Sequence, residues 1–252
     1  MNPEPDPPLL EHSHTPQAIA ERLSQANPQD DLGDFVLGAV DGTITTFAIV
    51  AGVAGSGLSA GVAIVLGMAN VLADGLSMAV GNYLKARSDH ELLERRRRME
   101  HRHIEQAPDG EREEVRQIFA AKGFDGETLE QVVEVITADR EQWVNTMLTE
   151  ELGMQISPPS PARAAVVTFV AFVLAGLAPI APLACSSWLG SKTTFLASTV
   201  LTFATFAAIG AVRGRVTEQG MLRGVLETVL VGGAASALAY LVGVTLRSLV
   251  GG

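Results

Sequence analysis

Cysteine, aromatic side chains and charge are all scarce in this chain. A single cysteine among 252 residues, Cys185, excludes an intramolecular disulfide and a CxxC metal site. Charged residues make up 18% and aromatic residues 5%, whereas hydrophobic residues reach 47%. This is the composition of a membrane protein. Acids outnumber bases by 28 to 18, so nucleic acid is not expected as a partner.

The N-terminal stretch also lacks the basic residues and the apolar core of a signal peptide. Residues 1–33 contain six acids and one base, and the first eight residues are rich in proline. We expect a disordered acidic tail with a short helix near residues 16–26. His12 and His14 are candidates for weak metal binding, although a solvated tail is the simpler explanation.

Most of the remaining charge lies in one segment. Residues 85–157 hold 17 of the acids and 11 of the bases, whereas the apolar remainder of the chain holds five acids and six bases. The net charge of −10 therefore belongs to the tail and to this segment. We interpret residues 85–157 as a soluble insert between membrane segments.

Five apolar segments are long enough to cross a bilayer, which requires about 20 residues of α-helix. A very short connection joins the first two, so residues 34–84 should form an antiparallel hairpin, and residues 158–252 should hold the other three. The chain is therefore predicted to be an all-α membrane protein with five transmembrane helices. Pro179 and Pro182 should kink or break the third span near its end. The predicted spans are residues 35–55, 58–84, 162–185, 193–212 and 224–250.

Lysine and arginine predict the orientation, because they accumulate on the cytoplasmic side of membrane proteins. The insert carries eleven of them, and four more arginines lie on the same side of the membrane. The opposite side has only Lys192 and Arg247. The N-terminus and the insert are therefore expected in the cytoplasm and the C-terminus outside. The four further arginines are Arg163, Arg213, Arg215 and Arg223.

The insert is predicted to contain three helices. The first continues the second span to about Gln106 and stops at a turn sequence beginning with Pro108. The second covers about residues 111–122, and the third runs from near Glu127 to just before Pro158. An apolar stripe on the third helix should form the core of the insert: Val132, Val133, Ile136, Trp143, Met147 and Leu148.

Polar side chains inside the first two spans form a candidate metal pathway: Asp41, Asn70, Asp74 and Met78. A charge at membrane depth costs a few kcal/mol and normally faces protein or water. The last three residues are spaced four apart and share a helix face, and Asp74 and Met78 should lie at a depth similar to that of Asp41. Carboxylates, an amide and a thioether suit a borderline divalent ion, for which protons compete. Alternatively, the carboxylates hydrogen-bond neighbouring helices and Met78 only packs.

The insert carries three pairs of metal-ligating residue types, each at a spacing that shares a helix face. Carboxylates with an imidazole and a thioether suit Fe(II), Mn(II), Co(II) or Zn(II) better than Ca(II). The alternative is an ordinary solvated charged face. The pairs are Glu100 with His103, Glu111 with Glu114, and Met147 with Glu151.

Three stretches carry a family resemblance: residues 34–42 with Asp41-Gly42, residues 73–84 with Ser77-Met78, and residues 150–153. They resemble the vacuolar iron transporter family over residues 33–250. The resemblance implies a five-span homodimer with the pathway at the subunit interface, which exchanges Fe(II), and often Mn(II), for protons and moves metal out of the cytoplasm. It also implies that the six insert residues are metal ligands and that Asp41 and Met78 are transport-site residues.

Three residues depart from the family pattern. Asn70 stands where plant members have glutamate, His103 stands where glutamate is expected, and Leu148 stands where a second methionine is expected. Asp74, one turn beyond Asn70, is a candidate to supply the missing charge. The imidazole of His103 should make metal loading more dependent on pH near neutrality.

The leading expectation is a proton-coupled exporter of Fe(II) or Mn(II), with the metal as substrate and no prosthetic group. The alternative is a membrane-anchored metal buffer or sensor, although a simple anchor has no use for two carboxylates at membrane depth. An enzyme is not expected, because the sequence has no nucleophile–base arrangement and no nucleotide motif. The missing targeting peptide favours a bacterial inner membrane, and the resemblance also permits an intracellular membrane.

Overall fold

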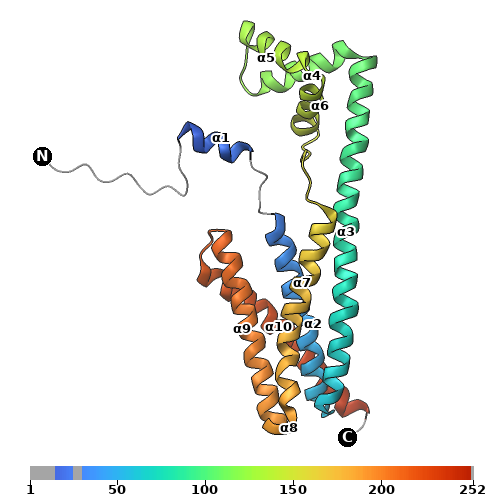
Figure 1. Cartoon of the computed structure of the whole chain (residues 1–252), viewed down its shortest axis with the longest axis vertical. Helices are drawn as coiled ribbons and strands as arrows, with labels where there is room; N and C mark the ends of the chain where they lie inside the picture. The colour runs from blue at the N-terminus through green and yellow to red at the C-terminus, as the bar shows by residue number, and fades with distance from the viewer. Residues whose placement is uncertain (1–14, 25–29, 251–252) are drawn as a thin grey trace, which may run out of the picture.

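A computed structural model describes residues 15–24 and 30–250 of the chain, and every regular element in these two ranges is helical. Five of the helices are long and apolar enough to cross a membrane, as the sequence predicts. They pack side by side as a bundle, and the insert projects from one end of that bundle (Figure 1). The five are α2 (Asp30–Ser56), α3 (Ala60–Gln106), α7 (Pro161–Ile180), α9 (Ser191–Val216) and α10 (Met221–Val250).

Outside the bundle, the N-terminal region contains the short helix α1 (Pro16–Ser24). This helix lies within the residues where a short helix was expected. Helix α2 begins at Asp30, three residues before the predicted end of the tail. His12 and His14 lie outside the described residues.

Helix α3 connects the bundle to the insert without interruption. Its 47 residues correspond to a length of about 70 Å at 1.5 Å per residue. The first half lies beside the other membrane helices, and the second half extends past them to the top of the molecule in Figure 1. The predicted continuation of the second span to Gln106 is therefore confirmed.

Helices α2 and α7 pack closely against each other, because glycines allow their backbones to come into contact. A Cβ atom on Gly38 would lie 2.2 Å from the carbonyl oxygen of Thr168, and one on Gly42 would lie 2.4 Å from that of Phe172. Small residues permit this close approach in a membrane, where apolar side chains gain little by leaving lipid. Gly42 follows Asp41 directly, so the contact also fixes the position of that carboxylate.

Proline ends the regular part of the third span. Helix α7 contains Pro179 and stops at Ile180, and the chain continues as a 3-10 helix over Ala181–Cys185 and the short α8 (Ser186–Leu189). The hydroxyl of Ser198 on α9 donates a 2.6 Å hydrogen bond to the carbonyl of Pro179. The break predicted from the two prolines is thus observed, and a neighbouring helix satisfies one of the carbonyls that it frees.

The insert differs from the prediction in its last part. Helix α4 (Pro108–Ala121) follows α3, and α5 (Gly126–Ala138) comes next. The expected single helix from Glu127 to Pro158 is wrong, because the chain bends at Asp139 and continues as α6 (Arg140–Thr146) and a π-helical turn, Met147–Glu151. Asp139 is extended and its carboxylate accepts a 2.9 Å hydrogen bond from the backbone N–H of Gln142, so it ends one helix and caps the next.

Candidate metal site in the insert and its counterpart in the membrane helices

The corner between α3 and α4 positions the main cluster of the insert. Ala107 has φ −140° and ψ 53°, and Pro108 starts α4 in the next position. Proline favours a first helical position because it has no N–H to satisfy there. The chain therefore folds back sharply, which brings Glu111 of α4 next to Glu100 and His103 of α3.

Glu100, His103 and Glu111 each offer one ligand atom, and these atoms all lie within 4.8 Å of one another. The Nδ1 atom of His103 is 3.3 Å from Oε1 of Glu111. Glu100 is only 1% exposed and Glu111 5%, whereas the His103 side chain is half exposed. Both oxygens of Glu100 and Oε2 of Glu111 are buried without a hydrogen-bond partner. Buried carboxylate oxygens are normally satisfied, and a cation is one way to satisfy them.

Burial and neighbouring negative charges raise the pKa values of carboxyl groups in and beside the cluster. Burial raises the pKa of Glu111 to about 7, and the nearby carboxylates of Glu114 and Glu100 contribute to this rise. Desolvation also raises the pKa of Glu151, with an additional contribution from Glu114. His103 acts in the opposite direction on both groups. Charged groups from three helical elements therefore act on the carboxyl groups of Glu111 and Glu151.

The other predicted insert ligands lie around this cluster. Glu114 and Glu151 are exposed, and their charges act on the cluster. Met147 is fully buried in the apolar core formed with Val115 and Trp143. Leu148, where the family pattern has methionine, is fully buried against Leu93 and Val144 and belongs to a separate apolar cluster.

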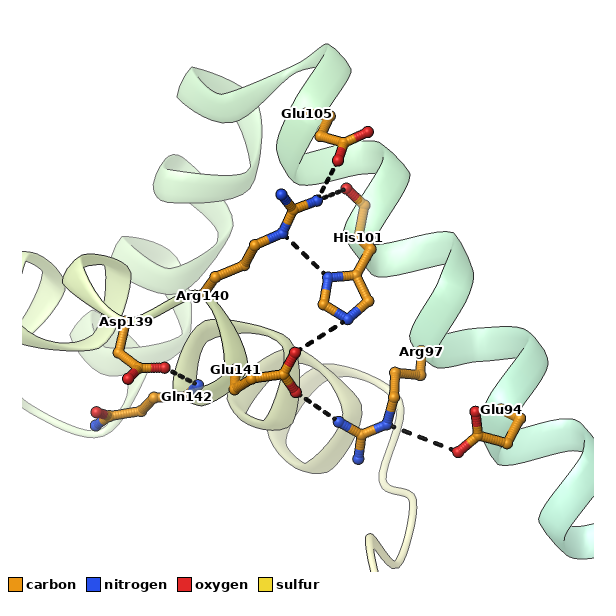
Figure 2. Close-up of polar contacts among 8 residues, drawn as sticks. All are labelled: Glu94, Arg97, His101, Glu105, Asp139, Arg140, Glu141 and Gln142. Carbon is orange, nitrogen blue, oxygen red and sulfur yellow. Dashed lines mark hydrogen bonds and ion pairs between the residues drawn. The ribbon is translucent and has the colours of Figure 1, made fainter.

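A polar network connects α6 to α3 (Figure 2). Arg140 donates from Nε to His101 Nδ1 over 3.1 Å and from Nη2 to the His101 carbonyl over 3.0 Å, and it also pairs with Glu105. Glu141 bridges His101 Nε2 at 3.4 Å and Arg97 Nη1 at 3.1 Å. Sequence patterns gave no indication of this network, because its members lie about 40 residues apart. Its contacts hold the segment that carries Met147 and Glu151 beside α3.

In the membrane helices, Asp41 and Met78 line one cavity of about 770 Å³. Asp74 acts electrostatically on Asp41, and the amide of Asn70 donates a 3.3 Å hydrogen bond to the hydroxyl of Thr45. All four candidate pathway residues are half-buried on facing sides of α2 and α3. Asp41 and Met78 thus line the same cavity, while the hydrogen bond of Asn70 connects α3 to α2.

Asn82 extends the polar strip in sequence but contacts a different part of the bundle. Its amide donates to Asp34 Oδ1 at 2.7 Å and to Thr168 Oγ1 at 2.8 Å, which connects α3 to α2 and α7. A second cavity of about 390 Å³ adjoins this contact below the insert and is also lined by Asp89 and Met154. Asn82 is therefore a structural tie between three helices.

The five membrane-length helices identify this molecule as an integral membrane protein. Its helical insert is acidic, and both the insert and the membrane helices carry residues of metal-ligating types. A family model described as the VIT family matches residues 32–244. The chain belongs to the VIT family.

Curated relatives agree with this assignment. The chain is 31% identical over 224 residues to a vacuolar iron transporter of Toxoplasma gondii, covering 86% of this chain and 74% of that protein. It is 31% identical over 208 residues to vacuolar iron transporter 1 of Eucalyptus grandis, covering 82% and 83% of the two proteins. The same identity and length hold for vacuolar iron transporter 1 of Arabidopsis thaliana, with 82% of each chain covered. The family resemblance stated from the sequence motifs is confirmed.

Proposed function

We propose that the protein transports Fe(II), and Mn(II) as a second substrate, out of the cytoplasm in exchange for protons. The observation that carries this proposal is the pair of buried carboxylates, Glu100 and Glu111. Both oxygens of Glu100 and Oε2 of Glu111 lack a hydrogen-bond donor. With His103 they offer two oxygens and a nitrogen that lie within 4.8 Å of one another, a set of ligand atoms that suits Fe(II) and Mn(II). The names of the relatives, all vacuolar iron transporters, favour iron.

In this proposal the insert captures the metal and the membrane helices carry it. Glu100, His103 and Glu111 bind the ion directly, Glu114 and Glu151 add negative charge beside it, and Met147 is the thioether available from the core. Asp41 and Met78 bind the ion during transit, supported by Asp74 and Asn70. The insert faces the cytoplasm, because its end of the bundle carries most of the basic residues.

Proton exchange follows from the chemistry of the same ligands. A carboxyl group with a pKa near 7 is about half protonated at neutral pH, so an arriving cation displaces a proton. Asp41 is a carboxylate at membrane depth and is the candidate for the same exchange in the pathway. Two copies of the chain are proposed to share the pathway, as the family resemblance implies.

Reconstitution into proteoliposomes tests transport directly. Uptake of Fe(II) and Mn(II) is measured separately with a pH-sensitive dye in the lumen, for the wild type, Asp41→Asn and Glu100→Gln. Glu218→Gln is the matched control, because Glu218 is an exposed acid in the loop between α9 and α10. We expect wild-type uptake with proton efflux, none for Asp41→Asn, and slower uptake at low metal concentration for Glu100→Gln.

The same experiment separates transport from a membrane-anchored buffer or sensor. Wild-type protein that binds metal through the insert but moves none across the membrane would refute the proposal in favour of the buffer. Metal uptake without a change in lumenal pH would refute proton exchange alone.

A further inference from the structure

The cavity lined by Asp41 and Met78 also has an ion pair in its lining. On the side facing α2 and α3, Arg213 of α9 and Glu227 of α10 line the same space of about 770 Å³. The rest of the lining is mostly aliphatic, including Val40 and Val231. The charged groups in this cavity are therefore Asp41 and the Arg213–Glu227 pair, across an otherwise apolar space.

Glu227 is held between two guanidinium groups. Its Oε2 atom accepts a 3.0 Å hydrogen bond from Nη2 of Arg213, and its Oε1 atom accepts one of 3.0 Å from Nε of Arg223. Arg223 does not line the cavity and its side chain is 70% exposed, whereas the side chain of Arg213 is 36% exposed. Glu227 thus neutralises the arginine on the cavity wall, and Arg223 holds the carboxylate from the solvent side.

Backbone contact between α9 and α10 fixes this arrangement. A Cβ atom on Gly224 would lie 2.2 Å from the carbonyl oxygen of Gly210, and one on Gly214 would lie 2.7 Å from that of Gly220. The two helices therefore touch on both sides of Arg213. The packing of α9 against α10 therefore determines the positions of Arg213 and Glu227, which are not two freely rotating surface side chains.

We propose that Arg213 and Glu227 form the electrostatic entrance to the Asp41 cavity, where Glu227 cancels the positive charge of Arg213 and so admits divalent cations. This inference deepens the proposed function and rests on it for its biological meaning. Without Glu227, an unpaired guanidinium would face the carboxylate that a divalent cation must reach. Charges that line a low-dielectric cleft change the local concentration of a charged substrate by about 10- to 1000-fold.

A thiol introduced into the cavity can report the electrostatic potential there, in an experiment that does not depend on transport. Cys185→Ser removes the single native cysteine, and Val231→Cys then introduces one thiol on the cavity wall. Its rates of modification by a cationic trimethylammonium and an anionic sulfonate methanethiosulfonate are compared in the full-length protein. The ratio of the two rates cancels differences in thiol ionisation and in overall accessibility.

We expect Glu227→Gln to lower the cation-to-anion rate ratio about tenfold. The double variant Arg213→Gln, Glu227→Gln should return the ratio to within about twofold of the wild-type value, because it removes the unpaired charge. Glu218→Gln serves as the control and should leave the ratio unchanged. If the ion pair had only a structural role, the cation-to-anion rate ratio of the double variant would differ from the wild-type ratio at least as much as that of Glu227→Gln does.

An unchanged ratio in Glu227→Gln, or a double variant that fails to recover, would overturn the assignment. In transport, the same variants should show about a tenfold higher apparent KM for Mn(II) in Glu227→Gln, recovered in the double variant, with Vmax little changed. A wild type that transports nothing would refute the proposed function, whereas the rate ratio would still test the entrance independently.

Discussion

Replacing Glu111 with glutamine should make the metal-free insert more stable at pH 8, although it removes a proposed ligand. The pKa of Glu111 is about 7 in the folded protein against 4.5 for an ordinary glutamate. A carboxyl group with a raised folded pKa binds protons more tightly in the folded state, so folding stability falls as pH rises from about 4.5 to about 7. This pKa shift lowers the free energy of unfolding by about 3 kcal/mol at pH values where Glu111 is ionised in both the folded and the unfolded state. At pH 5 it lowers that free energy by less than about 1 kcal/mol.

Glutamine keeps the shape of glutamate and cannot ionise, so Glu111→Gln should recover most of that free energy at pH 8 and little of it at pH 5. Trp143 is 6% exposed in the core of the insert and reports its unfolding. Trp188 belongs to α8, which lies at the end of the bundle away from the insert (Figure 1). Urea titration of full-length Trp188→Phe protein in detergent, followed by Trp143 fluorescence in the presence of a chelator, measures the difference.

The matched control is Glu113→Gln on the same helix, because Glu113 is solvent-exposed and its pKa is lowered by hydrogen bonds from Gln117 and Arg116. It should be neutral or slightly destabilising at both pH values. A Glu111→Gln variant that gains no stability at pH 8, or gains the same stability at pH 5 and pH 8, would refute this account of the cluster.

The candidate metal site and the packing of the helices can be tested in three other ways. Metal affinity of the chain, measured by calorimetry with Mn(II), should rise about tenfold per pH unit up to pH 7 as Glu111 loses its proton, and a flat wild-type profile would contradict this expectation. Asp139→Ala removes the cap of α6 and should destabilise the insert by about 1 kcal/mol in the Trp143 assay, with an unchanged urea midpoint as the contrary result. Gly42→Ala places a methyl group 2.4 Å from a carbonyl of α7, so it should lower the thermal stability of the bundle and abolish uptake; Gly52→Ala on the same helix has open space and should do neither.

Periodicity, length and charge distribution were sufficient to predict the membrane helices and the continuation of the second span into the insert. These features are repeated over many residues, so single exceptions do not hide them. The bend at Asp139 is different, because one capping side chain decides it. The apolar stripe continues across it from Val133 to Met147, and the same stripe fits one long helix or two short ones.

The sequence indicated which residues of the insert are candidate ligands, but not which of them lie next to one another in the folded chain. Spacing along a helix indicated which ligand types share a face, but not that Pro108 would bring Glu111 back against Glu100. The arginine–glutamate pair in the Asp41 cavity was beyond sequence reasoning for the same reason. Arg213 and Glu227 are 14 residues apart on different helices, and only close backbone contact at the glycines joins them.

The continuity of α3 has a consequence for how an ion would travel. Met78 and Glu100 are 22 residues apart on one unbroken helix, which corresponds to about 33 Å. Because a continuous helix cannot shorten, the proposed transport would require an ion released by the insert to reach the membrane cavity by diffusion through water. One ion confined within that radius has an effective concentration of about 10 mM. The insert would then act as a local reservoir that keeps the membrane pathway supplied when free metal in the surrounding solution is scarce.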